Sequence, residues 1–437
     1  MQGAVGAALD AHGATDARVA IALSGGRDSI ALLDAAARIV VADRLVACHV
    51  HHGLSPNADR WMAFCADACA VRGIAFDAQR IEVKAASRTS LEAEARRARY
   101  LALASMAERA GASFVLLAHH QDDQAETVLL QLLRGAGPQG LAAMPPSYRW
   151  RGRTWLRPLL GVPRRAIDAY VATRELRYVD DESNARGHFR RNALRLSVVP
   201  ALKALSPGYP ATIARAADHQ AEAARLLREL AAIDAAPHYD GVTLARAALA
   251  ELAPHRARNL LRWFLHEQGL PAPSTARLAA MMAQLRDARR DAGVLLRHAG
   301  ATVSVYRERI HVHEHPRERF AREWTGDAPL ALPHGTLRIA SLGQGELDAA
   351  RLFAHRVTVR SRQGGERFRP AADRPRRALK HMLREASLAP WERESLPLVF
   401  AGDALAVVPG IGVDPAFRAA PPTRGVALVW EPHARPR

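Results

Sequence analysis

The six residues 24–29, with the sequence SGGRDS, are of the types that bind phosphate groups. Two adjacent glycines permit positive φ angles and a close approach of the backbone to a ligand. An apolar run at residues 19–23 precedes them and an apolar helical pattern follows, which places them between a strand and a helix. Because a helix N-terminus presents unpaired N–H groups to an anion, the sequence predicts a phosphate-binding loop. Its residues are Ser24, Gly25, Gly26, Arg27, Asp28 and Ser29.

This loop is not one of the two most common nucleotide motifs, because it contains neither GxxxxGK[ST] nor GxGxxG. It resembles the SGGxDS pyrophosphate loop of the ATP pyrophosphatase (PP-loop) superfamily. The resemblance implies that ATP binds here, is cleaved between its α and β phosphates, and transfers AMP to an oxygen of the substrate. A plain glycine turn capped by Asp28 or Ser29 is the structural alternative.

A second polar segment, residues 118–127 with the sequence AHHQDDQAET, contains carboxylates and histidines. Asp123 and Glu126 are three residues apart and therefore share one face near the start of a helix. Beside a triphosphate, these two residues and Asp28 are predicted ligands of Mg²⁺. The alternative is that the helix dipole simply favours acidic residues there. His119 is a candidate for contacting the adenylate or moving a proton, because the ordinary pKa of histidine lies near neutrality.

Two further segments carry charges that could bind a substrate. Arg96 and Arg99 share one face of a predicted helix, either as substrate contacts or as part of a solvated basic surface. Residues 180–192 contain both carboxylates and arginines, which could hold a zwitterion, with acids on its ammonium group and arginines on its carboxylate. The cysteine and histidines at residues 48–52 do not have the spacing of a zinc site. Three cysteines in 437 residues suit a reducing compartment.

All these segments follow predicted strands. Strand patterns at residues 18–23, 44–50, 74–81 and 113–120 alternate with helical patterns, which predicts an α/β fold with a doubly wound parallel sheet. Ligands of such sheets bind beyond the carboxyl ends of the strands, where the polar segments lie.

The rest of the chain predicts two more domains. A helical pattern extends from residue 212 to residue 285, and a β-hairpin follows at residues 293–313. From about residue 356 the pattern becomes mixed, with strands at 357–361 and 404–413 and a helix between them. We expect a catalytic domain at residues 1–205, a mainly helical middle domain at 206–325 and a small α+β domain at 350–432.

The net charge of +17 indicates a polyanionic partner, most simply nucleic acid. Nine positive and two negative residues lie between positions 360 and 384. The predicted nucleic-acid contacts there are Arg360, Arg362, Arg367, Arg369, Arg376, Arg377 and Lys380. An Arg-rich composition without a special role is the alternative. No run of about 18 apolar residues and no secretory signal is found, so we expect a cytoplasmic protein without a membrane partner.

Taken together, the segments are similar to one family, tRNA(Ile)-lysidine synthetase. The loop, the LEAEARRARY helix, AHHQDDQAET, LLRGAGPQGL, RPLL and DESN follow in the family's order, and RSRQGGERFRP and VVPGIG extend the resemblance to the C-terminal part. The resemblance implies the adenine nucleotide α-hydrolase-like fold, ATP and Mg²⁺. It also implies that the wobble cytidine of tRNA(Ile) with a CAU anticodon is adenylated at C2 and attacked there by free L-lysine.

By position, the loop binds ATP, and His119, Asp123 and Glu126 serve the adenylate, the metal or lysine. Arg96 or Arg99 contacts the substrate, and the protein is a monomer or a homodimer. Two alternatives stay open: another PP-loop enzyme such as a 2-thiocytidine synthetase, and a tRNA-binding protein whose nucleotide site has decayed.

Overall fold

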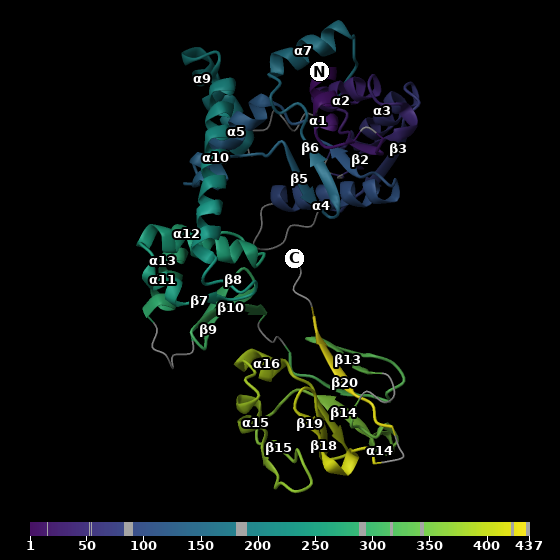
Figure 1. Cartoon of the computed structure of the whole chain (residues 1–437). Helices are drawn as coiled ribbons and strands as arrows, with labels where there is room; N and C mark the ends of the chain where they lie inside the picture. The colour runs from purple at the N-terminus through teal and green to yellow at the C-terminus, as the bar shows by residue number, and fades with distance from the viewer. Residues whose placement is uncertain are drawn as a thin grey trace. The chain divides into compact units, whose positions relative to one another are not determined.

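The computed structural model describes residues 1–433 except for residues 15, 52, 54, 83–90, 181–189, 288–293, 315–317, 341–344 and 421–423. The chain divides into two compact units, residues 1–226 and residues 227–437 (Figure 1). No helix among the described residues is both long and apolar enough to cross a membrane.

The first unit is built on a six-stranded sheet with the order β3-β2-β1-β4-β6-β5. Five strands are parallel to their neighbours, and β5 is antiparallel to β6 at the edge. The predicted parallel sheet is therefore confirmed, whereas the β5–β6 hairpin was not predicted. The strands are β1 Val19–Ala22, β2 Leu45–His51, β3 Ala75–Arg80, β4 Phe114–Leu116, β5 Ser147–Trp150 and β6 Arg153–Leu156.

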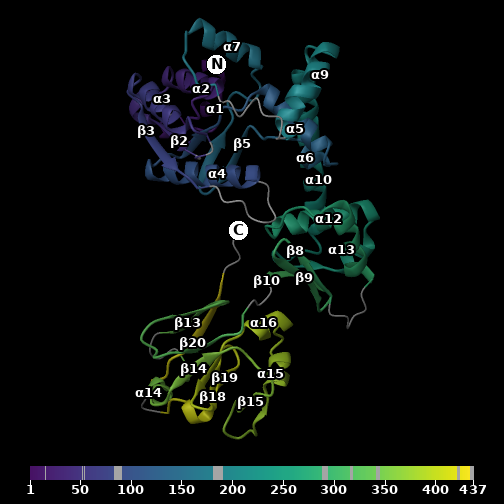
Figure 2. The ribbon, with the colours of Figure 1, turned by 180° about the vertical axis from the view of Figure 1, so that it is seen from behind.

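Helices cover both faces of this sheet, because alternate residues of each strand point to opposite sides. Ile21 and Leu23 belong to the core under α1 (Gln2–Asp10), α2 (Arg27–Ala37), α3 (Ala58–Ala70) and α7 (Arg164–Thr173). Ala20 belongs to the core under α4 (Leu91–Arg109), on the other side of the sheet (Figure 2). The remaining helices are α5 (Gln121–Leu132), α6 (Pro138–Leu141), α8 (Arg190–Ala193), a π-helical turn at Leu194–Val198, α9 (Val199–Leu205) and α10 (Tyr209–Ala235).

Asp34 fixes the position of α2, the helix that follows the predicted phosphate loop. Its carboxylate is 5% exposed and accepts hydrogen bonds from Tyr170 of α7 at 2.8 Å, Arg38 at 3.1 Å and Arg72 at 3.2 Å. Burial raises the pKa of this carboxyl, but the hydrogen bonds from Tyr170 and the two arginines outweigh burial and leave the pKa below its ordinary value. One charged group therefore ties α2 to α7 and to the end of α3.

The second unit begins with the end of α10 and three helices, α11 (Ala247–Glu251), α12 (Pro254–Glu267) and α13 (Thr275–Asp287). They share a core with an antiparallel sheet of order β7-β10-β9-β8. Its strands are β7 Leu244–Ala245, β8 Leu295–His298, β9 Ala301–Tyr306 and β10 Arg309–Glu314. The predicted hairpin is present within this sheet, as part of a three-stranded meander.

The C-terminal part contains a five-stranded sheet, β11-β14-β17-β18-β19, and a three-stranded sheet, β12-β13-β20. Both include strands that lie before residue 350, because β11 pairs with β14 and β13 pairs with β20. The predicted strand at 357–361 and the helix that follows it are present. The segment 404–413, predicted as one strand, instead forms two short strands that pair antiparallel with each other. The strands are β11 Ala321–Glu323, β12 Leu330–Leu332, β13 Gly335–Ile339, β14 Val357–Arg360, β17 Leu398–Ala401, β18 Ala404–Val408, β19 Gly412–Val413 and β20 Leu428–Pro432; a separate pair is formed by β15 Arg367–Phe368 and β16 Arg377–Ala378, and the helices are α14 Ala349–Phe353, α15 Leu379–Glu385 and α16 Pro390–Ser395.

Candidate nucleotide and substrate site

A cavity of about 560 Å³ lies in the first unit at the carboxyl ends of β1, β2 and β4. This is the position where parallel sheets of this kind bind ligands. The predicted phosphate loop forms one wall, α4 contributes three residues, and α7 and the π-helical turn contribute one each. Its lining includes Ser24, Gly26, Arg27, Asp28, Ser29, His49, His51, Trp61, Arg99, Tyr100, His119, Arg164 and Arg195.

The loop between β1 and α2 is held in one shape by glycine and by internal hydrogen bonds. Gly25 has φ 87°, and a Cβ there would lie 3.1 Å from the Sγ atom of Cys65. Ser29 Oγ donates to the carbonyl of Gly26 at 2.8 Å and accepts from the N–H of Ser24 at 3.2 Å. Gly26 is the N-cap of α2, so the first N–H groups of that helix face the loop. The loop therefore has the geometry of an anion site, as predicted.

The arginine of the loop, Arg27, forms hydrogen bonds with other residues of the protein. Arg27 donates to Asp168 of α7 at 2.6 Å and to the hydroxyl of Tyr178 at 3.0 Å. The hydrogen bond with Asp168 raises the pKa of Arg27. Arg27 thus anchors the loop to α7. Arg164 was not predicted as a site residue, yet it lines the cavity, and its charge partly offsets the burial that raises the pKa of nearby Asp28.

Asp28 and His120 lie together beside the loop. Burial raises the pKa of Asp28, and its Oδ1 atom is buried without a hydrogen-bond partner among the described residues. His120 is 1% exposed, and its Nε2 atom lies 3.7 Å from Asp28 and 3.4 Å from Asp123. The imidazole ring of His120 therefore lies near two of the three predicted metal ligands, Asp28 and Asp123. We singled out His119 from the sequence and not this adjacent histidine.

Asp123 and Glu126 form a closed network with two arginines that follow 65 or more residues later. Glu126 accepts from the Nε atoms of Arg191 at 2.7 Å and Arg195 at 2.6 Å. Both arginines also donate to Asp123 Oδ1 at 3.1 Å, and Asp123 Oδ2 accepts from the N–H of His120 at 3.1 Å. Burial raises the pKa of Asp123, but the charges of His120 and Arg191 leave the pKa below its ordinary value. We call these four residues the acid–arginine network.

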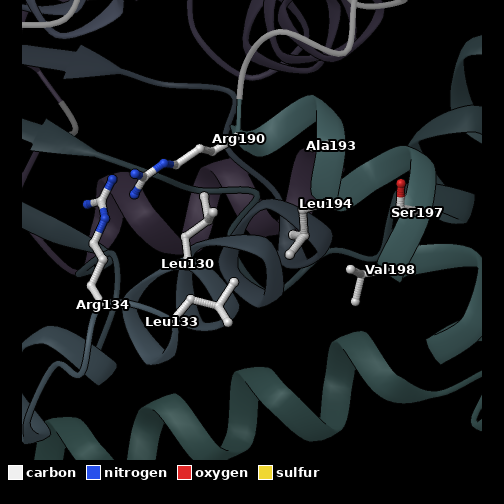
Figure 3. Close-up of a pocket in the computed structure, with 8 residues that line it drawn as sticks. All are labelled: Leu130, Leu133, Arg134, Arg190, Ala193, Leu194, Ser197 and Val198. Carbon is white, nitrogen blue, oxygen red and sulfur yellow. The ribbon is translucent and has the colours of Figure 1, made fainter.

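The two arginines meet the carboxylates together because they are four residues apart on one helix face. Other residues of the same helical segment line a second cavity of about 430 Å³. Figure 3 shows Arg134 and Arg190 at one end of this cavity and Ser197 and Val198 at the other. The sequence predicted the region around Arg191 as a zwitterion site but did not single out Arg195. Its spacing from Arg191 is the signal that could have identified it.

The other predicted residues of α4 and β4 have different environments. Arg99 lines the cavity, Arg96 lies over the ring of Tyr100, and Arg97 pairs with Glu94. His119 lines the cavity, and burial lowers its pKa to about 3. Burial disfavours the protonated form of His119, and the positive charges of Arg157 and Arg96 lower its pKa further.

His49 and His51, the described histidines at the end of β2, contact other protein groups. His49 bonds with the carbonyl of Leu23, and His51 lies 3.3 Å from Asp59. No cluster of three or more metal-binding side chains occurs among the described residues, and the three cysteines are free and buried. His52 and the segment 181–189 lie outside the described residues.

In the second unit the predicted basic residues fall into two groups. Arg360 and Arg362 lie beside Glu366, and Arg377 binds Glu385. Arg367, Arg376 and Lys380 are exposed, whereas Arg369 is half-buried and donates to the carbonyl of Arg374 at 3.2 Å. The exposed group is therefore the better placed to contact an external anion.

The loop geometry predicts unequal effects of two neighbouring substitutions. Gly25→Ala places a Cβ at a positive φ and against Cys65, so we expect a loss of about 1–2 kcal/mol in unfolding free energy and at least tenfold weaker ATP binding. Gly26→Ala is the matched control, because its φ is −69° and its Cβ would meet only Ser24 Oγ at 3.4 Å. Urea unfolding and ATP titration would measure both effects. Equal losses in the two variants would contradict the proposed constraint.

Comparison with known families identifies domain families and relatives that this chain resembles. Three family models match: a PP-loop domain at residues 4–202, a TilS substrate binding domain at 244–311 and a TilS substrate C-terminal domain at 357–430. The tRNA(Ile)-lysidine synthase of Burkholderia pseudomallei is 42% identical, with 94% of this chain and 92% of that protein covered. That of Nitrosomonas europaea is 39% identical, with coverage of 95% and 92%. That of Alkalilimnicola ehrlichii is 41% identical, with coverage of 94% and 93%.

The similarity extends along nearly the whole length of each relative and is not limited to the phosphate loop. The resemblance that the motifs predicted is thereby confirmed. The chain belongs to the tRNA(Ile)-lysidine synthase family.

Proposed function

We propose that this protein is an ATP-dependent ligase that joins free L-lysine to C2 of the wobble cytidine in tRNA(Ile) with a CAU anticodon. The observation that carries this proposal is one cavity that reaches from the phosphate loop to Arg195 of the acid–arginine network. Family membership supports the reaction, since the relatives are named for forming lysidine. A tRNA-binding protein with a decayed site would not need an ordered loop and four mutually bonded charged residues.

The proposed reaction takes place on one base in two steps. The C2 oxygen of cytidine attacks the α-phosphorus of ATP and expels pyrophosphate. The ε-amino nitrogen of lysine then attacks C2, the C2–O bond breaks, AMP leaves with that oxygen, and the amine loses a proton. Ser24, Ser29 and the first N–H groups of α2 would hold the phosphates throughout.

Mg²⁺ fits the end of the cavity at Asp28, beside the phosphate loop, better than the end at the acid–arginine network. The buried Oδ1 atom of Asp28 has no partner among the described residues, so Asp28 can bind a cation together with phosphate oxygens. Asp123 and Glu126 could do so only by releasing Arg191 and Arg195. Bound there, Mg²⁺ would neutralise charge on the phosphates. We therefore assign the metal to Asp28 and not to the network.

The acid–arginine network suits a zwitterion such as lysine. The ammonium group of a bound amino acid can replace an arginine on Asp123 or Glu126, and its carboxylate can take the released guanidinium. Each broken ion pair is then replaced by another, so no buried charge is left alone. His119 stays neutral because its pKa is about 3, so we propose that it contacts the adenylate and does not take the proton. Arg99 is the proposed substrate contact of α4, since it lines the cavity.

The first test concerns the products. Because the loop lacks the lysine of a GxxxxGK[ST] motif and matches a pyrophosphate loop, ATP should yield AMP and pyrophosphate. This should require both tRNA(Ile) and lysine for turnover, measured with labelled ATP by chromatography. Detection of ADP and inorganic phosphate as the primary products would overturn the proposal, as would full turnover without lysine.

A second test separates the two ends of the cavity. Glu126→Gln should raise the KM for lysine at least tenfold while changing the KM for ATP less than threefold, because it alters only the network. Asp28→Asn should instead raise the Mg²⁺ concentration needed for half-maximal activity. Glu108→Gln, on the exposed surface of α4, is the matched control. If Glu126→Gln affected ATP and lysine equally, the assignment of the network to lysine would be wrong.

The third test concerns tRNA binding by the exposed basic residues of the second unit. Ending the chain near residue 350 would remove β20 from its pairing with β13, so point substitutions are the cleaner change. Replacing Arg367, Arg376 and Lys380 by Gln should weaken tRNA binding and reduce the log–log salt slope by roughly 0.7–0.9 per lost phosphate contact. Arg338→Gln, on β13 and paired with Glu431, is the control. An unchanged slope would show that these exposed residues do not contact the phosphates of tRNA.

A further inference from the structure

Aromatic and arginine side chains interleave on α4 and the β5–β6 hairpin, next to the cavity. The rings of Tyr100 and Tyr148 stack on buried Trp155, with centroids 5.4 and 5.9 Å away, and Trp150 lies 5.6 Å from it. An arginine lies over each of the three outer rings. These pairs are Arg96 over Tyr100 at 5.0 Å, Arg157 over Tyr148 at 4.8 Å and Arg151 over Trp150 at 5.4 Å. We call these three rings and three arginines the aromatic–arginine surface.

Core packing explains only part of this surface. Trp155 is fully buried in the core under α4, and Tyr148 is its cross-strand neighbour. Tyr100, Tyr148 and Trp150 are only half-buried, and β5 is an edge strand. Among the described residues, no carboxylate pairs with the arginines of this surface. Arg157 is 7% exposed and donates to the carbonyl of Pro145 at 2.7 Å, so it supports Tyr148 from within the protein. Arg96 and Arg151 are exposed, so they supply the charge with which this surface can bind an anion.

The aromatic–arginine surface is continuous with the cavity. Tyr100 and the adjacent Arg99 line the cavity wall. The charges of Arg157 and Arg96 lower the pKa of His119, which places both near this cavity residue. A chain that has one group inserted into the cavity would therefore lie over this surface as it leaves.

We propose that the aromatic–arginine surface binds the nucleotides next to the reacting cytidine, an inference that rests on the proposed function. A base that enters a cavity leaves the stack of its loop, and its neighbours lose a stacking partner. A guanidinium plane that lies over a ring, or the ring itself once an exposed arginine moves to a phosphate, can replace that partner for any base. Recognition of single-stranded RNA loops commonly combines these two contacts. The ligand class is thus a single-stranded RNA segment, held by stacking and by charge.

The test uses the full-length protein and a stem-loop RNA with a CAU loop, in which the adenine that follows the cytidine is replaced by 2-aminopurine. Binding to the wild-type protein should quench the fluorescence of this base, because it stacks on a ring. Trp150→Leu should abolish the quenching and weaken binding roughly 5- to 150-fold, whereas Trp150→Phe should retain most of both. Arg151→Glu should weaken binding and flatten its salt dependence. Arg18→Glu, just before β1 at the amino ends of the strands, is the matched charge control and should bind like the wild type.

Unchanged ATP affinity in every variant would show that the first unit is still folded. If wild-type protein modified this RNA but Trp150→Leu and Arg151→Glu bound it as well as Arg18→Glu, the inference would be overturned and the proposed function would stand. If wild-type protein bound the RNA but never formed AMP with lysine, the proposed function would fail, whatever the quenching showed.

Discussion

The acid–arginine network is the interaction on which the candidate site depends most. Asp123 and Glu126 are 9% and 5% exposed, so their charges need partners within the protein. Arg191 and Arg195 supply those partners from a helical segment that begins after residue 189, and they thereby fix this segment against α5. The two carboxylates and two guanidinium groups of the network cancel in charge, so the network would not repel a neighbouring polyphosphate. It also presents both signs of charge, as an amino acid does.

The opposite end of the cavity is fixed by a different constraint. Asp34 connects α2 to α7 and to the end of α3, and Arg27 connects the loop to α7, so hydrogen bonds of charged groups support the phosphate loop. Gly25 adopts a positive φ and has no Cβ, so the backbone can pass close to the side chain of Cys65. The shape of the loop is therefore fixed both by its own serines and by ion pairs with neighbouring helices. A site held this way does not need to reorganise when phosphate binds.

The sequence predicted the parallel sheet and the polar segments at its carboxyl end, because strand–helix alternation and local motifs are readable within about ten residues. It did not predict the β5–β6 hairpin. Each of its strands has only four residues and contains an arginine, so apolar and polar residues do not alternate clearly. Nor did it identify Arg195, Arg164 or His120, because their roles arise from partners distant in sequence. The lowered pKa of His119 could not be predicted from the sequence for the same reason, since burial and the charge of Arg157 are tertiary properties. Local patterns thus identified the motifs, but which groups neutralise one another is a property of the fold.

The distribution of charge around the cavity gives each end its own chemistry. Arg27, Arg191 and Arg195 all bind carboxylates, so little of their charge is left for a triphosphate. Arg164 and the N–H groups of α2 remain near the loop, and they are few against the several negative charges of ATP. A divalent cation on Asp28 would supply the missing positive charge at the phosphate end. Because the arginines of the network are already balanced, a second polyanion would gain little there, whereas a zwitterion exchanges pair for pair. On the proposed assignment, the same balance that weakens the network as a phosphate site would favour a ligand that carries both charges.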